Sequence, residues 1–260
     1  IKTHHNRVPI IEKMIEEGKV IEPLADLYKV EVRELGETLG ISHELLWRHP
    51  FPGPGLGVRL LCNSGLPDRA GFEEAEPLLN EVGERFGLKA ALLPIRSVGV
   101  KADLRAYEHP VLLTGSAPWD ALIQAASAVT KEIPGINRCI WNLSSDAPAT
   151  TTPLATTVTR ERLDLLREAD HIVMEALRRH GLYDEIWQCP TVLVPLQLGD
   201  RQGELVVVRP VLSERAMTAR PYPLPEAVLA DLRAEILTLP GVSGLALDIT
   251  SKPPGTIEWE

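Results

Sequence analysis

The amino-acid sequence predicts an α+β protein made of two repeated units, a pseudo-dimer in which each unit packs helices on one face of a small sheet. Two observations predict this class. Helix-like and strand-like segments alternate along residues 71–260, and some sequential strands are close enough to pair antiparallel. The order helix, two strands, helix, strand then occurs twice, about 100 residues apart. A helical segment precedes both units.

That first segment shows helical patterning without a strand. Residues 9–17 place Ile10, Ile11, Met14 and Ile15 on one helical stripe, and residues 24–39 repeat such a stripe before Gly40, a typical helix end. Neither stripe has a sheet on which to pack. We therefore expect the tail of a domain that begins upstream.

A rigid loop follows the helical segment. Residues 49–55 contain three prolines and two glycines, which exclude a helix and disfavour a central strand. The loop joins the helical segment to the first repeat.

The two repeats are matched by their helices, strands and Pro-Gly turns. A single match of this kind is weak, but four in the same order indicate duplication. The matched segments are 71–87 and 91–95 with 159–181 and 192–196; 109–112 with 209–212; helices 119–132 with 225–237; and 133–148 with 239–254. The Ala-, Thr- and Pro-rich linker 147–157 separates the units, which gives domains at 1–57, 58–148 and 149–260.

Composition excludes several classes of protein. Apolar residues make up 44% of the 260-residue chain and charged residues 24%, which is ordinary globular usage. The net charge of −9 argues against broad binding to nucleic acid or to acidic membranes. Three isolated cysteines suit a reducing compartment and form no metal motif. We expect a cytoplasmic protein without a metal site of its own, a nucleic-acid partner or a membrane partner.

Four motifs carry a family resemblance. Residues 1–6 (IKTHHN), 48–56 (RHPFPGPGL), 93–100 (LPIRSVGV) and 251–260 (SKPPGTIEWE) occur in this order and extend to the end of the chain. The chain resembles the C-terminal portion of the glutamine-hydrolysing GMP synthetases. The resemblance implies that residues 1–57 are the tail of an ATP-pyrophosphatase domain and that the rest binds xanthosine monophosphate (XMP) and mediates dimerisation.

The resemblance also implies a reaction. In the family, ATP with Mg²⁺ adenylates XMP, and ammonia from a glutaminase domain then displaces AMP to give GMP. The family's Gly-rich ATP loop is not found in this sequence, because 63–65 (NSG) and 97–99 (SVG) lack its spacing. We therefore expect ATP and Mg²⁺ to be bound mainly by an upstream domain, in cis or in trans, and this chain alone to be inactive.

Two groups of residues take catalytic or nucleotide-facing roles by the resemblance. The first resembles the family's lid loop, whose cation and imidazoles suit charge developing on pyrophosphate: Lys2, His4, His5 and Asn6. The second resembles a nucleotide-facing loop: Phe51, Pro52, Gly53, Pro54 and Gly55. A stiff hinge is the alternative interpretation of the second group.

The XMP-binding residues that the resemblance implies lie in both repeats: Asp103, Arg105, Gln188, Lys252, Ile257 and Glu258. Ala102 stands where the family usually has Gly, which puts the turn before Asp103 in doubt. A surface ion pair is the alternative for Arg105, and a structural role is the alternative for Gln188. Arg96 is either a phosphate ligand or an interface residue.

The two repeats keep complementary halves of these motifs. The first keeps Asp103 and Arg105 but has Asp146 where a phosphate-binding lysine would stand, whereas the second keeps Gln188, Lys252 and Glu258 but has lost the arginine motif. An ancestral homodimer with a shared site would decay in this way after fusion. We therefore expect one composite site per chain and a monomer with an internal pseudo-dimer.

Two other classes of function remain open. The chain could be a non-catalytic nucleotide-binding subunit that partners a separate ATP-pyrophosphatase. It could also be a purely structural dimerisation piece without affinity for XMP.

Overall fold

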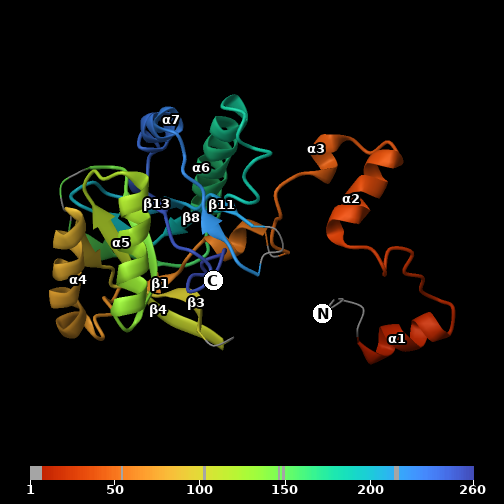
Figure 1. Cartoon of the computed structure of the whole chain (residues 1–260), viewed down its shortest axis with the longest axis horizontal. Coiled ribbons are helices and arrows are strands. Elements are labelled where there is room, and N and C mark those ends of the chain that lie inside the picture. The colour runs from red at the N-terminus through yellow and green to blue at the C-terminus, as the bar shows by residue number, and fades with distance from the viewer. Residues whose placement is uncertain (1–7, 54, 102–103, 146, 148–149, 214–216) are drawn as a thin grey trace. The chain divides into compact units, whose positions relative to one another are not determined.

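The computed structural model describes residues 8–53, 55–101, 104–145, 147, 150–213 and 217–260 (Figure 1). The chain divides into two compact units, 1–48 and 49–260. The predicted domains 1–57, 58–148 and 149–260 remain predictions.

Residues 8–48 of the first unit form three helices: α1 (Pro9–Glu16), α2 (Lys29–Thr38) and α3 (His43–Leu46). Gly40, predicted as a helix end, has φ +81°, a left-handed conformation that glycine adopts without a side-chain clash. Within this unit the Arg33 guanidinium lies over the Trp47 ring, 5.1 Å from its centroid.

The second unit has four α-helices in its described part, together with one short 3₁₀ helix and thirteen strands. The helical elements are η1 (Gly55–Arg59), α4 (Phe72–Phe86), α5 (Trp119–Glu132), α6 (Arg160–Arg179) and α7 (Glu226–Ile236). The strands are β1 (Asn63–Ser64), β2 (Lys89–Leu92), β3 (Ser97–Lys101), β4 (Leu104–Thr114), β5 (Ile136–Asn142), β6 (Thr151–Pro153), β7 (Ala155–Thr156), β8 (Thr191–Val194), β9 (Leu196–Leu198), β10 (Glu204–Val208), β11 (Val211–Leu212), β12 (Arg220–Pro221) and β13 (Val242–Asp248).

Helix ends follow local sequence signals. Gly71 and Gly87 both adopt left-handed conformations and bound α4, and the backbone N–H of Gly87 closes the last turn. Thr159 caps the N-terminus of helix α6, and its hydroxyl accepts a hydrogen bond from the Arg162 backbone N–H at 3.3 Å. The predicted helices 71–87, 119–132 and 159–181 are thus confirmed to within a residue or two.

One seven-stranded sheet organises the unit. Its strand order is β2-β4-β5-β13-β10-β8, and β3 pairs with β4 beside this path. In the first half, β2 is antiparallel and β5 parallel to β4; in the second half, β8 is antiparallel and β13 parallel to β10. The halves meet where β5 and β13 pair antiparallel, with Ala246 opposite Asn142. The predicted α+β class is confirmed.

The ladders also correct one predicted match. Leu92 lies opposite Val111, and Leu193 lies opposite Val206. If segment 91–95 matches segment 192–196, Val111 is therefore equivalent to Val206. Pro110, however, lies opposite Arg138, and Leu205 lies opposite Gly244. The match of 109–112 to 209–212 is therefore wrong by five residues, because the apolar strand β10 ends before Arg209.

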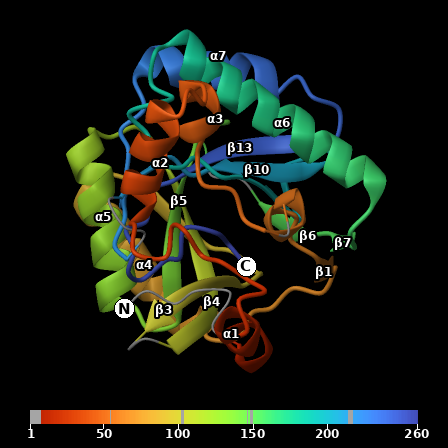
Figure 2. The same ribbon diagram turned by 90° about the vertical axis from the view of Figure 1, so that its right-hand side faces the viewer.

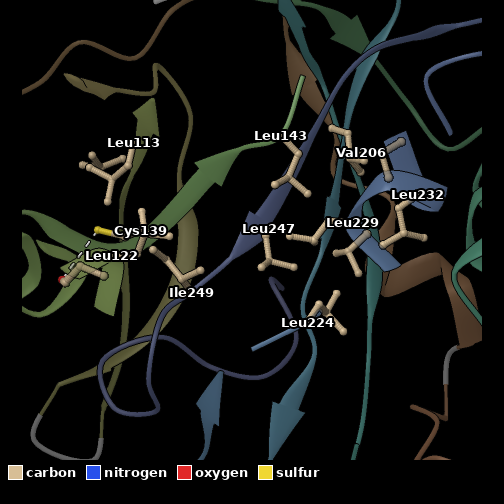
Figure 3. Close-up of a cluster of buried hydrophobic side chains, with 14 of the residues drawn as sticks. Leu113, Leu122, Cys139, Leu143, Val206, Leu224, Leu229, Leu232, Leu247 and Ile249 are labelled. Carbon is tan, nitrogen blue, oxygen red and sulfur yellow. Dashed lines mark hydrogen bonds between the residues drawn. The ribbon is translucent and has the colours of Figure 1, made fainter. Parts of the chain in front are cut away.

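The two faces of the sheet bury different clusters. Alternation along β10 directs Val206 toward the cluster that α4, α5, α6 and α7 cover, and Val207 toward a second cluster with Trp259. Figure 2 shows α5 and α6 against the sheet. In the first cluster, Leu122 and Cys139 of the first half and Leu229 and Leu247 of the second lie along one row (Figure 3).

No helix in the described ranges is both long enough and apolar enough to cross a membrane.

Candidate functional site

The C-terminal tail is docked into the protein. The Trp259 side chain is fully buried, and its indole Nε1 donates a hydrogen bond to Asp248 Oδ2 at 3.0 Å. Ile257 is buried as well, with 7% of its surface exposed. A terminal segment is ordinarily poorly ordered unless side chains hold it. The tail after β13 is therefore a fixed part of the fold.

Strand β3 of the first half pairs with this tail. The Val98 N–H donates to the Trp259 carbonyl at 3.0 Å, and the Val100 N–H donates to the Pro254 carbonyl at 2.7 Å. Strand β3 therefore lies between β4 on one side and the tail on the other.

Gly99 permits this close approach. A Cβ atom at Gly99 would lie 2.6 Å from the Pro254 carbonyl oxygen, closer than real Cβ contacts allow. The glycine in the 93–100 motif is thus explained by the tail that lies against it.

Glu258 is held by two side chains. The Arg59 guanidinium donates from Nε at 3.1 Å and from Nη2 at 3.0 Å to the two oxygens of the Glu258 carboxylate. Gln188 Nε2 donates to the same carboxylate at 2.9 Å. Glu258 itself remains 20% exposed, so its carboxylate is fixed in orientation while it stays accessible. Two of the predicted residues, Gln188 and Glu258, are therefore in direct contact.

A fully buried ionic cluster lies beneath the tail. Asp248 accepts from Arg138 Nη1 and from Arg209 Nη1, both at 2.6 Å, and all three side chains are fully buried. Burial alone raises the pKa of the Asp248 carboxyl, but the charges of Arg209 and Arg138 outweigh it and hold that pKa below its ordinary value. The same Arg138 guanidinium stacks on the Trp259 ring, 4.7 Å from its centroid.

Lys252 begins the tail close to this cluster. Its backbone N–H donates to the Ala219 carbonyl at 2.8 Å, which ties the tail to the segment before β12. Its side chain is half-buried. Burial lowers the pKa of the Lys252 ammonium, and the nearby charge of Arg209 lowers it further.

Arg105 lies one strand away from the tail. Its backbone pairs with Val100 across β3 and β4, and Val100 in turn bonds the tail. Since neighbouring strands are about 4.8 Å apart, the Arg105 backbone lies about 10 Å from the tail. Its side chain is exposed.

The remaining predicted residues divide into two groups. Lys2, His4, His5, Asn6, Pro54 and Asp103 lie outside the described residues. In the predicted nucleotide-facing loop, the exposed Phe51 ring lies under the Arg59 guanidinium, 5.0 Å from its centroid, and Gly55 donates its N–H to the Pro52 carbonyl at 2.9 Å. Gly53 is exposed.

Arg96 pairs within the first half. Its Nε donates to Asp68 at 2.6 Å and its Nη1 to the Tyr107 carbonyl at 2.9 Å. Both contacts lie within the first half, so the phosphate-ligand and interface interpretations of Arg96 stay predictions.

Sequence reasoning missed the buried charges of the site. Arg59, Arg209 and Asp248 each stand inside a run of apolar residues, and Arg138 directly precedes one, where charged side chains are rare unless they are paired. That contradiction between residue type and surroundings was the signal that could have found them.

The described residues do not fit a Mg²⁺–ATP site. No group of three or more histidines, cysteines or acidic residues that could hold a metal ion occurs among them. The sequence also lacks a Gly-rich phosphate loop.

Comparison with known proteins gives the family. Residues 175–259 match the model of the GMP synthase C terminal domain, a range that includes Gln188, Lys252 and Glu258. A probable GMP synthase (glutamine-hydrolyzing) of Leptospira interrogans is 41% identical over 273 residues, covering 100% of this chain and 43% of its own length.

More distant relatives also match along the whole chain. The GMP synthase (glutamine-hydrolyzing) of Dictyostelium discoideum is 31% identical over 310 residues, which cover 100% of this chain and 43% of that protein. The corresponding protein of Thermobifida fusca is 33% identical over 268 residues, 100% of this chain and 33% of its own length. This chain therefore belongs to the GMP synthase family and spans less than half the length of these relatives.

Proposed function

We propose that this chain is the nucleotide-binding part of a GMP synthase, which holds XMP while ATP-dependent adenylation and amination convert it to GMP. Gln188, Lys252, Ile257 and Glu258 form the second-half side of the site, and Asp103 and Arg105 complete it from the first half. The observation that supports this proposal most is the pairing of β3, the strand before Asp103 and Arg105, with the tail that carries Lys252 and Glu258.

Four of the proposed ligand residues have a definite chemical task. The Gln188 amide has both a donor and an acceptor with which to read a purine base. The Glu258 carboxylate, already oriented by Arg59, accepts hydrogen bonds from ribose or base N–H and O–H groups. Lys252 and Arg105 supply positive charge for the phosphate, and the Arg105 side chain is exposed.

The proposed pseudo-dimer draws support from the sheet. The two halves have the same pairing pattern and meet through an antiparallel pair, β5 and β13, as a twofold relation requires. We infer from this twofold relation that the two halves are copies of one ancestral unit and that a single site survives between them.

The chemistry of ATP lies outside the residues described here. We infer that ATP and Mg²⁺ act through the ATP-pyrophosphatase part of the enzyme, whose tail is residues 1–57, and that ammonia comes from a glutaminase part. Incubated alone with XMP, ATP, Mg²⁺ and ammonia, the chain should release no AMP above the protein-free rate. AMP release would overturn this assignment.

A calorimetric titration tests the binding function. We expect saturable binding of XMP, with much weaker binding of IMP and AMP because their bases present different polar edges. Lys252→Ala should weaken XMP binding at least about tenfold, the loss expected for one charge-assisted contact. Lys131→Ala, on helix α5, is the matched control and should leave the affinity unchanged.

The other outcomes decide against the proposal. Equal affinity for XMP, IMP and AMP would indicate a general nucleotide-binding subunit. No binding at all would indicate a structural piece.

A further inference from the structure

The buried arginines of the protein differ in how their nitrogens are satisfied. Arg138 has a partner for each: Nε donates to Ser97 Oγ at 3.3 Å, Nη1 to Asp248 at 2.6 Å and Nη2 to the Val98 carbonyl at 2.9 Å. Arg162 likewise donates from Nε and Nη2 to Glu204 and from Nη1 to the Thr157 carbonyl, at 2.6–2.7 Å. These two arginines show how the fold satisfies a structural guanidinium.

Arg209 does not follow this pattern. Only its Nη1 is paired, with Asp248 at 2.6 Å and with the Thr250 carbonyl at 3.0 Å. Its Nε and Nη2 are buried and have no hydrogen-bond partner within the described chain. Buried donors without partners are costly, especially on a charged group. Burial lowers the pKa of the Arg209 guanidinium to about 10, the direction expected for a poorly compensated cation.

The charges within the buried cluster do not balance, although Glu258 also acts on Arg209 from outside it. Arg138 and Arg209 contribute two positive charges and share one carboxylate, Asp248, so this buried cluster carries a net charge of about +1. Lys252 adds a further cation close enough for Arg209 to lower the pKa of its ammonium. An anion bound beside Arg209 would offset the excess positive charge of the buried cluster.

The first half of the sheet forms equivalent strands without charged residues at the positions of Arg209 and Asp248. Val208 pairs with Leu247 in the second half, and Leu113 pairs with Trp141 at the equivalent place in the first half. The next residues, Arg209 and Thr114, are therefore equivalent. Asp248 similarly takes the place of Asn142 in the central pair. The first half thus forms the same strands with two neutral residues, which argues that the charges of the second half serve a ligand.

We propose that Arg209 is a phosphate-binding residue, whose Nε and Nη2 hold the 5′-phosphate of the bound nucleotide together with the Lys252 ammonium. The proposal rests on the proposed function and adds to it a fixed cation that the family motifs did not indicate. A guanidinium presents two parallel N–H groups that match two phosphate oxygens, whereas a lysine supplies an adjustable point charge. Nε and Nη2 of Arg209 are buried in this structure. Phosphate can therefore reach them only if neighbouring residues move aside.

The test compares two conservative variants of the whole chain. Arg209→Lys keeps a positive charge beside Asp248 but removes the two parallel donors. Arg162→Lys is the matched control, because Arg162 is nearly buried in an ion pair in which every nitrogen already has a partner. Each protein is titrated with XMP and with xanthosine, which lacks the phosphate. Thermal unfolding is measured with and without inorganic phosphate.

The proposal predicts a loss specific to phosphate. Arg209→Lys should weaken XMP binding at least about tenfold and leave xanthosine binding unchanged. Arg162→Lys should change neither affinity. A purely structural Arg209 predicts instead that Arg209→Lys lowers the unfolding temperature while the ratio of XMP to xanthosine affinity stays as in the parent chain, and that result would overturn the proposal.

Failure of the proposed function gives a different pattern. If the parent chain binds neither XMP nor xanthosine, the function is wrong, and Arg209 is then judged by inorganic phosphate alone. Stabilisation by phosphate that is lost in Arg209→Lys supports the anion site; absence of stabilisation in the parent chain excludes it. If Arg209→Lys does not fold, Arg209→Gln, which keeps the Arg138–Asp248 pair intact, gives the same readouts.

Discussion

At the scale of single residues, the structure depends on charges buried where apolar side chains are expected. Asp248 is the only carboxylate that contacts both Arg138 and Arg209 among the described residues, and it also accepts from the Trp259 indole. One side chain thus joins the sheet to the tail. Charged groups in such positions stabilise only while they stay paired, so the loss of Asp248 leaves two uncompensated cations.

Asp248→Asn should therefore destabilise the folded chain by about 3–5 kcal/mol at pH 7, as measured by denaturant unfolding. Asp164→Asn removes a carboxylate of an exposed ion pair on α6 and should cost less than about 1 kcal/mol. Equal losses in the two variants would show that the buried cluster contributes no more than a surface pair.

The difference in free energy of unfolding between the parent chain and Asp248→Asn should depend on pH with a definite sign. The pKa of Asp248 is lower in the folded chain than its value of about 3.9 in an unfolded chain. Its contribution is thus fully present above about pH 4 and is lost as the pH falls through the folded pKa. The stability gap between the parent chain and Asp248→Asn should be constant from pH 5 to 7 and shrink below about pH 4. A gap that widens on acidification contradicts the ion-pair account.

At the scale of elements, the contact between β3 and the tail decides whether the two halves share a site. Gly99 lies at this contact, and its Cβ-free backbone lets the Pro254 carbonyl approach. The sequence predicted the helices of this unit closely, because glycine ends and apolar stripes are local signals. The sequence did not predict the pairing of β3 with the tail, because the two segments are separated by more than 150 residues. Neither segment has a local pattern that indicates which segment it pairs with.

Gly99→Ala should loosen the tail and weaken XMP binding by more than its effect on stability accounts for. The added methyl group would lie 2.6 Å from the Pro254 carbonyl and push the tail that carries Lys252 and Glu258. Gly83→Ala is the matched control, since its methyl group would meet the Leu88 carbonyl at the same 2.6 Å, away from the tail. Both variants should lower the unfolding temperature, but only Gly99→Ala should reduce XMP affinity. Equal reduction in both would mean that general destabilisation explains the loss.

At the scale of the whole molecule, the two halves form one sheet in a single chain. Periodicity predicted the α+β class and most helices, and the family motifs predicted Gln188 and Glu258, which do touch. The strand match at Arg209 failed because an Arg-Pro pair resembles a His-Pro pair in sequence, while the register depends on the apolar run before it. The buried arginines were not predicted, because their partners come from distant strands.

The pairing of β5 with β13 also bears on assembly. Within the chain, each half already covers the sheet edge that the other presents. Sedimentation velocity should therefore show a monomer over the micromolar range. A stable dimer would contradict the internal pseudo-dimer as a substitute for a second chain.

The central claim is that one chain builds one nucleotide site from both of its halves. The most direct measurement is a crystal structure of the chain with XMP bound. We predict that the nucleotide touches Arg105 together with Lys252 and Glu258 of the same chain. XMP held by Lys252 and Glu258 with Arg105 turned away, or with an arginine supplied by a second molecule, would contradict the claim.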